Sequence, residues 1–153
     1  MNNELLRSLI SSKVPEAEFS GEETQFLNVI IKPEDLRTLT EFLRNDPQTK
    51  LDFLFCMTAV DWMTHFFTVY HLRSTETDQT LVIKVKINDR ENPEVETVCD
   101  IWKTAEFHER EVYDLFGIKF KNHPDLRRIL LEDDWVGYPL RKDYKDEANI
   151  VEL

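Results

Sequence analysis

Three strand-like segments with short connections constrain the fold of this chain more than any other feature. They cover residues 51–61, 65–73 and 80–88 and are rich in aliphatic and aromatic side chains. Residues 81–87 read Leu-Val-Ile-Lys-Val-Lys-Ile, so that four aliphatic side chains point to one face and both lysines to the other. Because short connections favour antiparallel neighbours, we expect a β-meander covered on one side.

Helices are predicted before and after this meander. Residues 5–10 place four aliphatic side chains on one helical face, which indicates a short first helix. Residues 33–45 begin with Pro-Glu-Asp, which is typical of a helix start, and residues 105–116 form a helical segment that Gly117 ends. Residues 25–31 are rich in β-branched side chains and predict a further strand. The expected fold is α+β, with two layers: a mainly antiparallel sheet with helices on one face. The helix over residues 33–45 should bury Leu36, Leu39, Phe42 and Leu43.

Composition excludes several classes of function. Nineteen Lys and Arg against thirty Asp and Glu give a net charge of −11, which argues against nucleic-acid binding. The longest uncharged apolar stretch, residues 53–60, is far shorter than the roughly twenty residues of a transmembrane helix. No secretory signal is visible, so a cytoplasmic location is expected. The two cysteines, Cys56 and Cys99, form no Cys-x-x-Cys pair, and we expect no disulfide framework, metal site or cluster in this chain.

Catalytic motifs receive little support. Residues 108–111, His-Glu-Arg-Glu, resemble the start of a zincin motif, but Val112 occupies the position of the second histidine. Glu109, Glu111 and Asp114 lie within two helical turns and could form an acid–base pair, although such a charged helical face is usually a solvated or salt-bridged surface. The sequence has no glycine-rich nucleotide loop and no Gly-x-Ser-x-Gly. An independent acid–base enzyme that uses Glu109, Asp114 and His108 is therefore a remote alternative.

The segment after Gly117 is the best candidate for a binding element. Residues 117–144 contain two prolines and no regular periodicity, yet they include a Trp, two Tyr, a Phe and several aliphatic residues. So long an irregular segment in a compact domain is usually functional or disordered, and this composition argues against disorder. We therefore divide the chain into an α+β domain, residues 1–117, and an extended, partner-docking C-terminal strap, residues 118–153. The other interpretation is that this segment folds back on its own sheet with its charges in solvent.

Three blocks in this region resemble one known family. They are Glu109-Arg110-Glu111-Val112-Tyr113-Asp114-Leu115-Phe116-Gly117-Ile118, His123-Pro124-Asp125-Leu126-Arg127-Arg128-Ile129-Leu130 and Pro139-Leu140-Arg141-Lys142-Asp143-Tyr144. The blocks resemble the signature of the "30 kDa" subunit family, the C subunit of NADH-quinone oxidoreductase (respiratory complex I). The similarity is close over residues 102–144, whereas residues 1–100 resemble the family only in length and order of elements.

The resemblance implies a cofactor-free, non-catalytic subunit of the peripheral arm of a proton-translocating NADH:quinone oxidoreductase. It implies packing against the D subunit, which helps to form the quinone pocket and which we call the quinone-site subunit. FMN and iron–sulfur clusters are expected in partner subunits, and the location is the cytoplasmic face of the cell membrane. A separate small protein, not fused to the quinone-site subunit, is expected. The alternative is the equivalent subunit of a membrane-bound hydrogenase or another donor:quinone oxidoreductase complex.

The resemblance also selects the residues expected at the partner interface. They are Glu109, Arg110, Glu111, Tyr113, Asp114, Phe116, Gly117, His123, Pro124, Asp125, Arg127, Arg128, Trp135, Arg141, Lys142, Asp143 and Tyr144. Among them, Arg127, Arg128 and Arg141 are expected to meet carboxylates of the quinone-site subunit or of this domain. We also expect Gly117→Val to disturb the end of its helix, because a β-branched residue resists positive φ.

Overall fold

The computed structural model describes residues 2–20 and 26–145. Within them the helices are α1 (Asn3–Lys13), α2 (Leu36–Asn45, preceded by the 3₁₀ turn Pro33–Asp35) and α3 (Ala105–Phe116). The strands are β1 (Glu18–Ser20), β2 (Asn28–Ile31), β3 (Phe53–Asp61), β4 (Phe66–Arg73), β5 (Thr80–Ile87), β6 (Glu94–Glu96) and β7 (Lys119–Lys121). Gln25, the first residue of the strand predicted over residues 25–31, lies outside the described residues, as do residues 146–153 of the strap.

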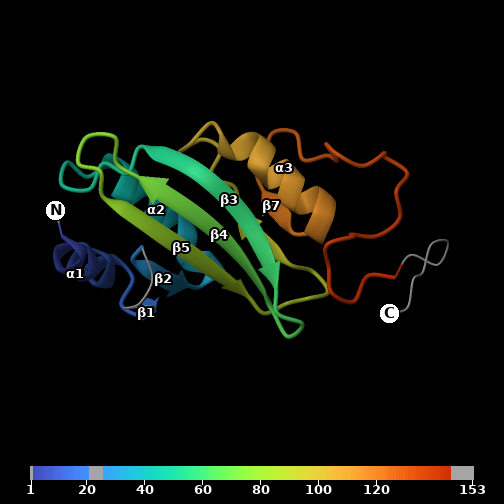
Figure 1. The fold of residues 1–153 in the computed structure, drawn as a ribbon, viewed down its shortest axis with the longest axis horizontal. Coiled ribbons are helices and arrows are strands. Elements are labelled where there is room, and N and C mark those ends of the chain that lie inside the picture. Colours follow the sequence, from blue (N-terminus) through green and yellow to red (C-terminus); the bar gives the residue numbers. More distant parts are fainter. Residues whose placement is uncertain (1, 21–25, 146–153) are drawn as a thin grey trace.

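Strands β1 to β5 form one sheet in the order β1-β2-β5-β4-β3 (Figure 1). The predicted meander is confirmed: β3 pairs antiparallel with β4, and β4 with β5. Strand β2 joins the other side of β5 in parallel, with Val29 opposite Ile83. The sheet is therefore mixed but mainly antiparallel, as expected for this α+β chain.

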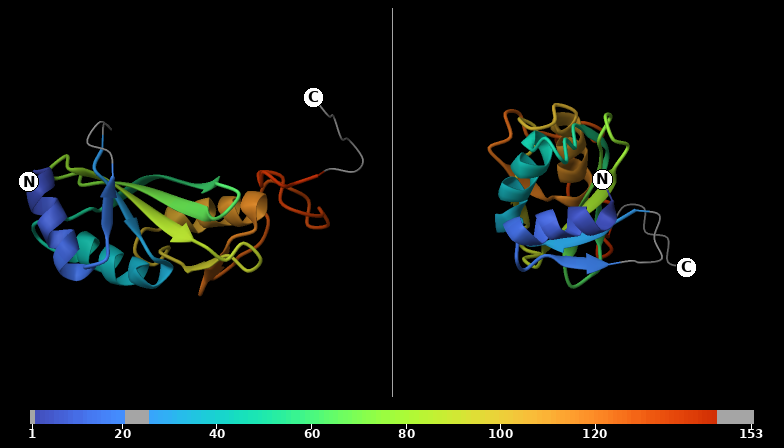
Figure 2. Two further views of the ribbon diagram at one scale, coloured as in Figure 1. Left: turned by 90° about the horizontal axis from the view of Figure 1, so that it is seen from below. Right: turned by 90° about the vertical axis from the view of Figure 1, so that its left-hand side faces the viewer.

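All three helices of the described chain lie on one face of this sheet, as Figure 2 shows from below. This arrangement confirms the expected two-layer fold. The core between the layers combines aliphatic side chains of the helices with Phe66, Tyr70 and Ile83 of the central strands, which are fully buried. Phe42, which we expected in the core, is only half-buried, and the Lys13 ammonium lies 4.9 Å from the centre of its ring.

The end of α3 directs the chain toward the strap. Gly117 has a φ of 74°, in the left-handed region, and its N–H donates to the Tyr113 carbonyl at 2.8 Å. The next residues form β7, which pairs in parallel with β6 and places Phe120 opposite Val95. This small ladder was not predicted, because three residues carry no detectable periodicity. Among the described residues, no helix combines the length and the apolar character that crossing a membrane requires.

Candidate functional site

Helix α3 carries three charged side chains that the strap encloses. Glu109 and Asp114 are fully buried, and only 8% of Arg110 is exposed. The expectation of a solvated face is therefore wrong for these three residues, although Asp114 does form an ion pair, with Arg128, and Glu111 is exposed. The physical reason is that other segments supply hydrogen-bond partners that replace water: the strap does so for Arg110 and Asp114, and Thr97 and Val98 do so for Glu109.

Asp114 is the main anchor of the strap. Its Oδ2 atom accepts hydrogen bonds from three consecutive backbone N–H groups, those of Ile129, Leu130 and Leu131, at 3.2, 2.7 and 3.0 Å. Its Oδ1 atom accepts from Nη1 of Arg128 at 3.0 Å. Burial opposes the charged form, but these hydrogen bonds outweigh it and hold the pKa of Asp114 below its ordinary value. A single carboxylate thus fixes a turn of the strap.

Two arginines bind the backbone of the strap. Arg128 donates from Nη2 to the carbonyls of Trp135 and Gly137, at 3.1 and 2.8 Å. Arg110 donates to the carbonyls of Arg127 and Arg128, at 3.1 and 3.0 Å. Because these bonds go to main-chain atoms, they fix the path of the strap while its side chains remain available for other contacts.

A second anchor connects the strap to the sheet. Asp61, at the end of β3, is paired with Arg90 and accepts a hydrogen bond from the Lys142 backbone N–H at 2.9 Å. Burial disfavours its charge, yet the bonds from Arg90, Lys142 and Met63 lower the pKa of Asp61 to about 2. Arg90 also reaches Asp143 at 3.3 Å. Sequence reasoning missed Asp61 and Arg90, since they lie far from the signature blocks and no local pattern distinguishes them.

Gly117 and the last part of the strap meet closely. A Cβ atom on Gly117 would lie 2.5 Å from carbons of the Tyr138 ring and 2.8 Å from Nη2 of Arg141. Arg141 donates from Nε to the Phe116 carbonyl, so that it binds main chain and has no carboxylate partner among residues 2–20 and 26–145. Gly137 has a φ of 87°, and the half-buried ring of Tyr144 packs against it. Both glycines therefore serve close approach as well as backbone conformation.

A second set of buried polar groups surrounds Glu109. Its two oxygens accept hydrogen bonds from the Thr97 hydroxyl and the Val98 N–H. Burial is the main cause that raises the pKa of Glu109 to about 7. The buried His123 side chain is 4.0 Å away; its Nε2 atom donates to the Glu106 carbonyl and its Nδ1 atom accepts from the Asp125 N–H.

Potential ligand atoms of Cys99, Glu109 and His123 lie within 4.8 Å of one another. This set does not fit a metal ion, because both oxygens of Glu109 and both ring nitrogens of His123 are already engaged. Burial also raises the pKa of the Cys99 thiol, which disfavours the thiolate that metals bind. The cluster is better described as a buried polar network beneath the strap.

Of the other predicted interface residues, Phe116 is buried in the core, and the rest lie at the surface or at its edge. Arg127 pairs with Asp125 in an exposed ion pair, and the Lys142 ammonium lies 5.6 Å from the centre of the Trp62 ring. Pro124 is exposed, Trp135 is 38% exposed, and Tyr113 is half-buried beside Tyr138. The strap also exposes apolar side chains that we had not selected, namely Ile129, Leu130, Val136 and Leu140, with exposed fractions of 39%, 64%, 87% and 52%.

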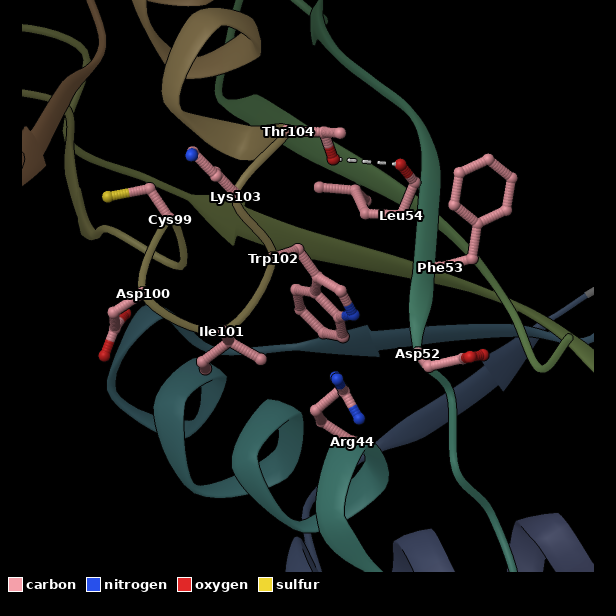
Figure 3. Close-up of a pocket in the computed structure, with 10 residues that line it drawn as sticks. All are labelled: Arg44, Asp52, Phe53, Leu54, Cys99, Asp100, Ile101, Trp102, Lys103 and Thr104. Atoms are coloured by element: carbon pink, nitrogen blue, oxygen red, sulfur yellow. Dashed lines mark hydrogen bonds between the residues drawn. The ribbon is translucent and has the colours of Figure 1, made fainter.

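A surface depression of about 500 Å³ lies elsewhere, between β3, α2 and the loop before α3 (Figure 3). Its polar groups serve the fold: Thr104 donates to the Leu54 carbonyl, Asp52 accepts from Thr75, and the Trp102 indole N–H donates to the Leu51 carbonyl. Asp100 is paired with Arg37. None of these contacts pairs a nucleophile with a base, so the depression offers no catalytic arrangement.

The arrangement of α3 and the strap can be compared with known proteins. Residues 29–149 match the family model described as the 30 Kd subunit of respiratory-chain NADH dehydrogenase. The chain belongs to this 30 kDa subunit family. The match includes both anchors and the whole described strap, and it confirms the resemblance seen in the sequence.

Relatives in the family include separate and fused proteins. The C subunit of NADH-quinone oxidoreductase from Geotalea uraniireducens is 45% identical over 143 residues, which cover 91% of this chain and 83% of that protein. The C/D subunit of NADH-quinone oxidoreductase from Phocaeicola vulgatus is 50% identical over 114 residues, or 74% of this chain. The matched part is 22% of the C/D protein, so this chain corresponds to about a fifth of it.

A solved structure is also similar to this member of the 30 kDa family. It is a chain in the structure of the membrane-bound sulfane sulfur reductase, an archaeal respiratory membrane complex. The two chains share 28% identity with a TM-score of 0.77, and the match covers 95% of this chain and 86% of the other. The same fold is thus present in a chain of an archaeal respiratory membrane complex.

Proposed function

We propose that this chain is the 30 kDa subunit of an NADH-quinone oxidoreductase and joins the quinone-site subunit to the peripheral part of that complex. Its role is structural: it supplies no electron carrier and positions neighbouring subunits that carry FMN and iron–sulfur clusters. Family membership supports the complex, and the names of the C/D relatives support the quinone-site D subunit as the partner. Peripheral association on the cytoplasmic side of the membrane belongs to the same proposal.

The observation that carries this proposal is the orientation of the strap. Its backbone is bound by Asp114 and Arg110 of α3 and by its own Arg128, whereas the apolar side chains of Leu130, Val136 and Leu140 are exposed to solvent. A segment fixed in this way loses little conformational entropy when a partner covers it. The strap is therefore organised to present an apolar surface to another protein.

Co-purification from gently solubilised native membranes tests the assignment. A tagged chain should recover the quinone-site subunit, together with FMN, iron–sulfur clusters and NADH-dependent quinone reduction. Recovery of a hydrogenase or of a sulfane sulfur reductase would instead place the chain in a related complex, an outcome that the similar solved structure makes worth measuring. Recovery of the chain alone would contradict the proposal.

Docking through the strap is tested by a double substitution, Leu130→Asp with Val136→Asp. Both side chains are exposed, so the variant should fold normally while placing two carboxylates in an apolar interface. We expect recovery of the quinone-site subunit to fall at least tenfold at unchanged circular dichroism. Leu5→Asp on α1, where Leu5 is 42% exposed, is the matched control and should retain that subunit. Undiminished recovery with the double variant would rule out docking through the strap.

A further inference from the structure

The face of the main sheet that carries no helix has an unusual composition for a surface in contact with solvent. The open sheet face, as we call it, includes Phe53, Phe55 and Val60 of β3, which are 44%, 39% and 36% exposed. A sheet with one solvated face normally places polar side chains there. Figure 1 is viewed onto this face, and Figure 2 shows the helices on the opposite side.

Cross-strand register makes this face continuous. Val60 lies opposite Phe67, and Phe67 opposite Lys86. In the next row, Thr58, Val69, Lys84 and Ile30 follow one another from β3 to β2. The His71 ring lies between those of Phe55 and Phe26, at 5.7 and 6.2 Å, and extends the apolar surface along β4.

The centre of the open sheet face is positively charged although the chain as a whole carries −11. Lys84 and Lys86 point outward from β5, and neither has an ion-pair partner among residues 2–20 and 26–145. Desolvation is the main cause that lowers the pKa of His65 and of His71. The charge of Lys86 adds to the effect at His65, and the charge of Lys84 adds to it at His71. Two unpaired ammonium groups among apolar side chains favour a partner that brings carboxylates.

One short stretch of the strap is acidic. Its exposed apolar residues are accompanied by Glu132, Asp133 and Asp134, which are also exposed. The described strap as a whole nevertheless holds seven Lys and Arg against five Asp and Glu, so its charge is mixed, whereas the open sheet face has two lysines at its centre.

We propose that the open sheet face is a second docking surface, which binds a separate protein subunit with an apolar centre and carboxylates opposite Lys84 and Lys86. A symmetric dimer through this face would place these lysines against their own copies and is disfavoured. A membrane is a poor occupant too, since two lysines are fewer than the roughly four to eight basic residues of a typical lipid-binding cluster. The chain is then held between two neighbours, one at the strap and one at the sheet.

Site-specific photocrosslinking in the native assembly tests this proposal. A benzophenone side chain at the exposed Thr58 should form a crosslink to a protein other than the strap partner, within a peptide that contains Asp or Glu. The same probe at the exposed Ser11 of α1 serves as the control. Crosslinks from Thr58 only to a second copy, to residues of the same chain or to lipid would overturn the proposal, as would the absence of any crosslink.

Charge reversal gives an independent readout. Lys84→Glu with Lys86→Glu should reduce recovery of the crosslinked subunit at least tenfold, whereas Lys84→Arg with Lys86→Arg should retain it. Lys13→Glu with Lys103→Glu changes the net charge equally at two exposed positions that lie off this face and outside the strap, and should have no effect. A reciprocal Asp→Lys or Glu→Lys change in the partner should restore recovery with the charge-reversed chain. Full recovery with the charge-reversed chain would refute the proposal, while retention of the quinone-site subunit in every variant separates it from the role of the strap.

Discussion

At the scale of single residues, Glu109 is the group most affected by its surroundings. Its side chain is fully buried, and its pKa is raised to about 7 chiefly by loss of hydration. The folded chain therefore binds the Glu109 proton more tightly than the unfolded chain. The stabilisation is complete below the unfolded pKa of about 4.5 and is lost as the pH rises through about 7.

Glu109→Gln should remove this pH dependence. For the native chain, the free energy of unfolding should fall by up to about 3 kcal/mol from pH 5 to pH 8 through this group. Gln is uncharged at both pH values, so the variant should lose that part of the change. Urea unfolding at the two pH values measures it, and an unchanged pH dependence in the variant would contradict the assignment. Asp61 does not affect this comparison. Its pKa is about 2, so the stability that its charged form contributes is lost only well below pH 5.

Residue identity alone did not reveal the burial of Glu109, Arg110 and Asp114. The spacing on α3 predicted one charged face, and such faces are usually solvated. For Arg110 and Asp114, burial depends on residues 127–131 of the strap, which return to the helix and donate or accept hydrogen bonds; for Glu109 it depends on the distant Thr97 and Val98. No pattern within α3 contains that information. The family resemblance did select these residues, but it did not indicate that they act inside the molecule.

At the scale of secondary structure, the junction between α3 and the strap depends on Gly117. Any other residue would meet two obstacles there: a left-handed backbone with φ of 74° and the Tyr138 ring at 2.5 Å from its Cβ position. The sequence predicted the first obstacle from the position of glycine after a helix. The second depends on tertiary packing and was not predictable.

Gly117→Val should lower the free energy of unfolding by about 2 kcal/mol or more, from backbone strain and the steric clash together. Thermal unfolding measures the loss. Gly117→Ala combined with Tyr138→Ala separates the two causes, since removal of the ring should recover only the steric part. If the two alanine substitutions prove strictly additive, Tyr138 does not restrict this position.

Elements differed in how well the sequence predicted them, and length is the reason. The helix over residues 105–116 and the strands within 51–61, 65–73 and 80–88 carry eight or more residues of periodic pattern and were found. Strands β1, β6 and β7 have three residues each and were missed. The parallel pairing of β2 with β5 was also missed, because it depends on contacts between segments that are distant in the sequence.

At the scale of the whole molecule, net charge and exposed apolar surface have opposite effects on the association of one copy of the chain with another. The net charge of −11 at pH 7 keeps copies of the chain apart, while the strap and the open sheet face both expose large apolar side chains. The sequence pI is about 4.8, so this repulsion disappears in mildly acidic solution.

The isolated chain should therefore associate as the pH falls from 7.5 to 5, measured by light scattering. Leu130→Ser with Val136→Ser should reduce the association without changing the net charge, whereas Leu5→Ser should not. A chain that stays monomeric at pH 5 would show that these apolar surfaces do not cause self-association.

The bond from the Lys142 N–H to Asp61 joins residues 81 positions apart in the sequence. Loop closure over such a separation is slow compared with forming local helices and hairpins, and the N-terminal part of a chain is synthesised first. Asp61 is in position only when β3 has paired with β4. The Lys142 N–H of the strap can therefore bind Asp61 only after this part of the sheet has formed. We therefore expect the strap, which is the proposed docking surface, to reach its final position last during biosynthesis, after the sheet has folded.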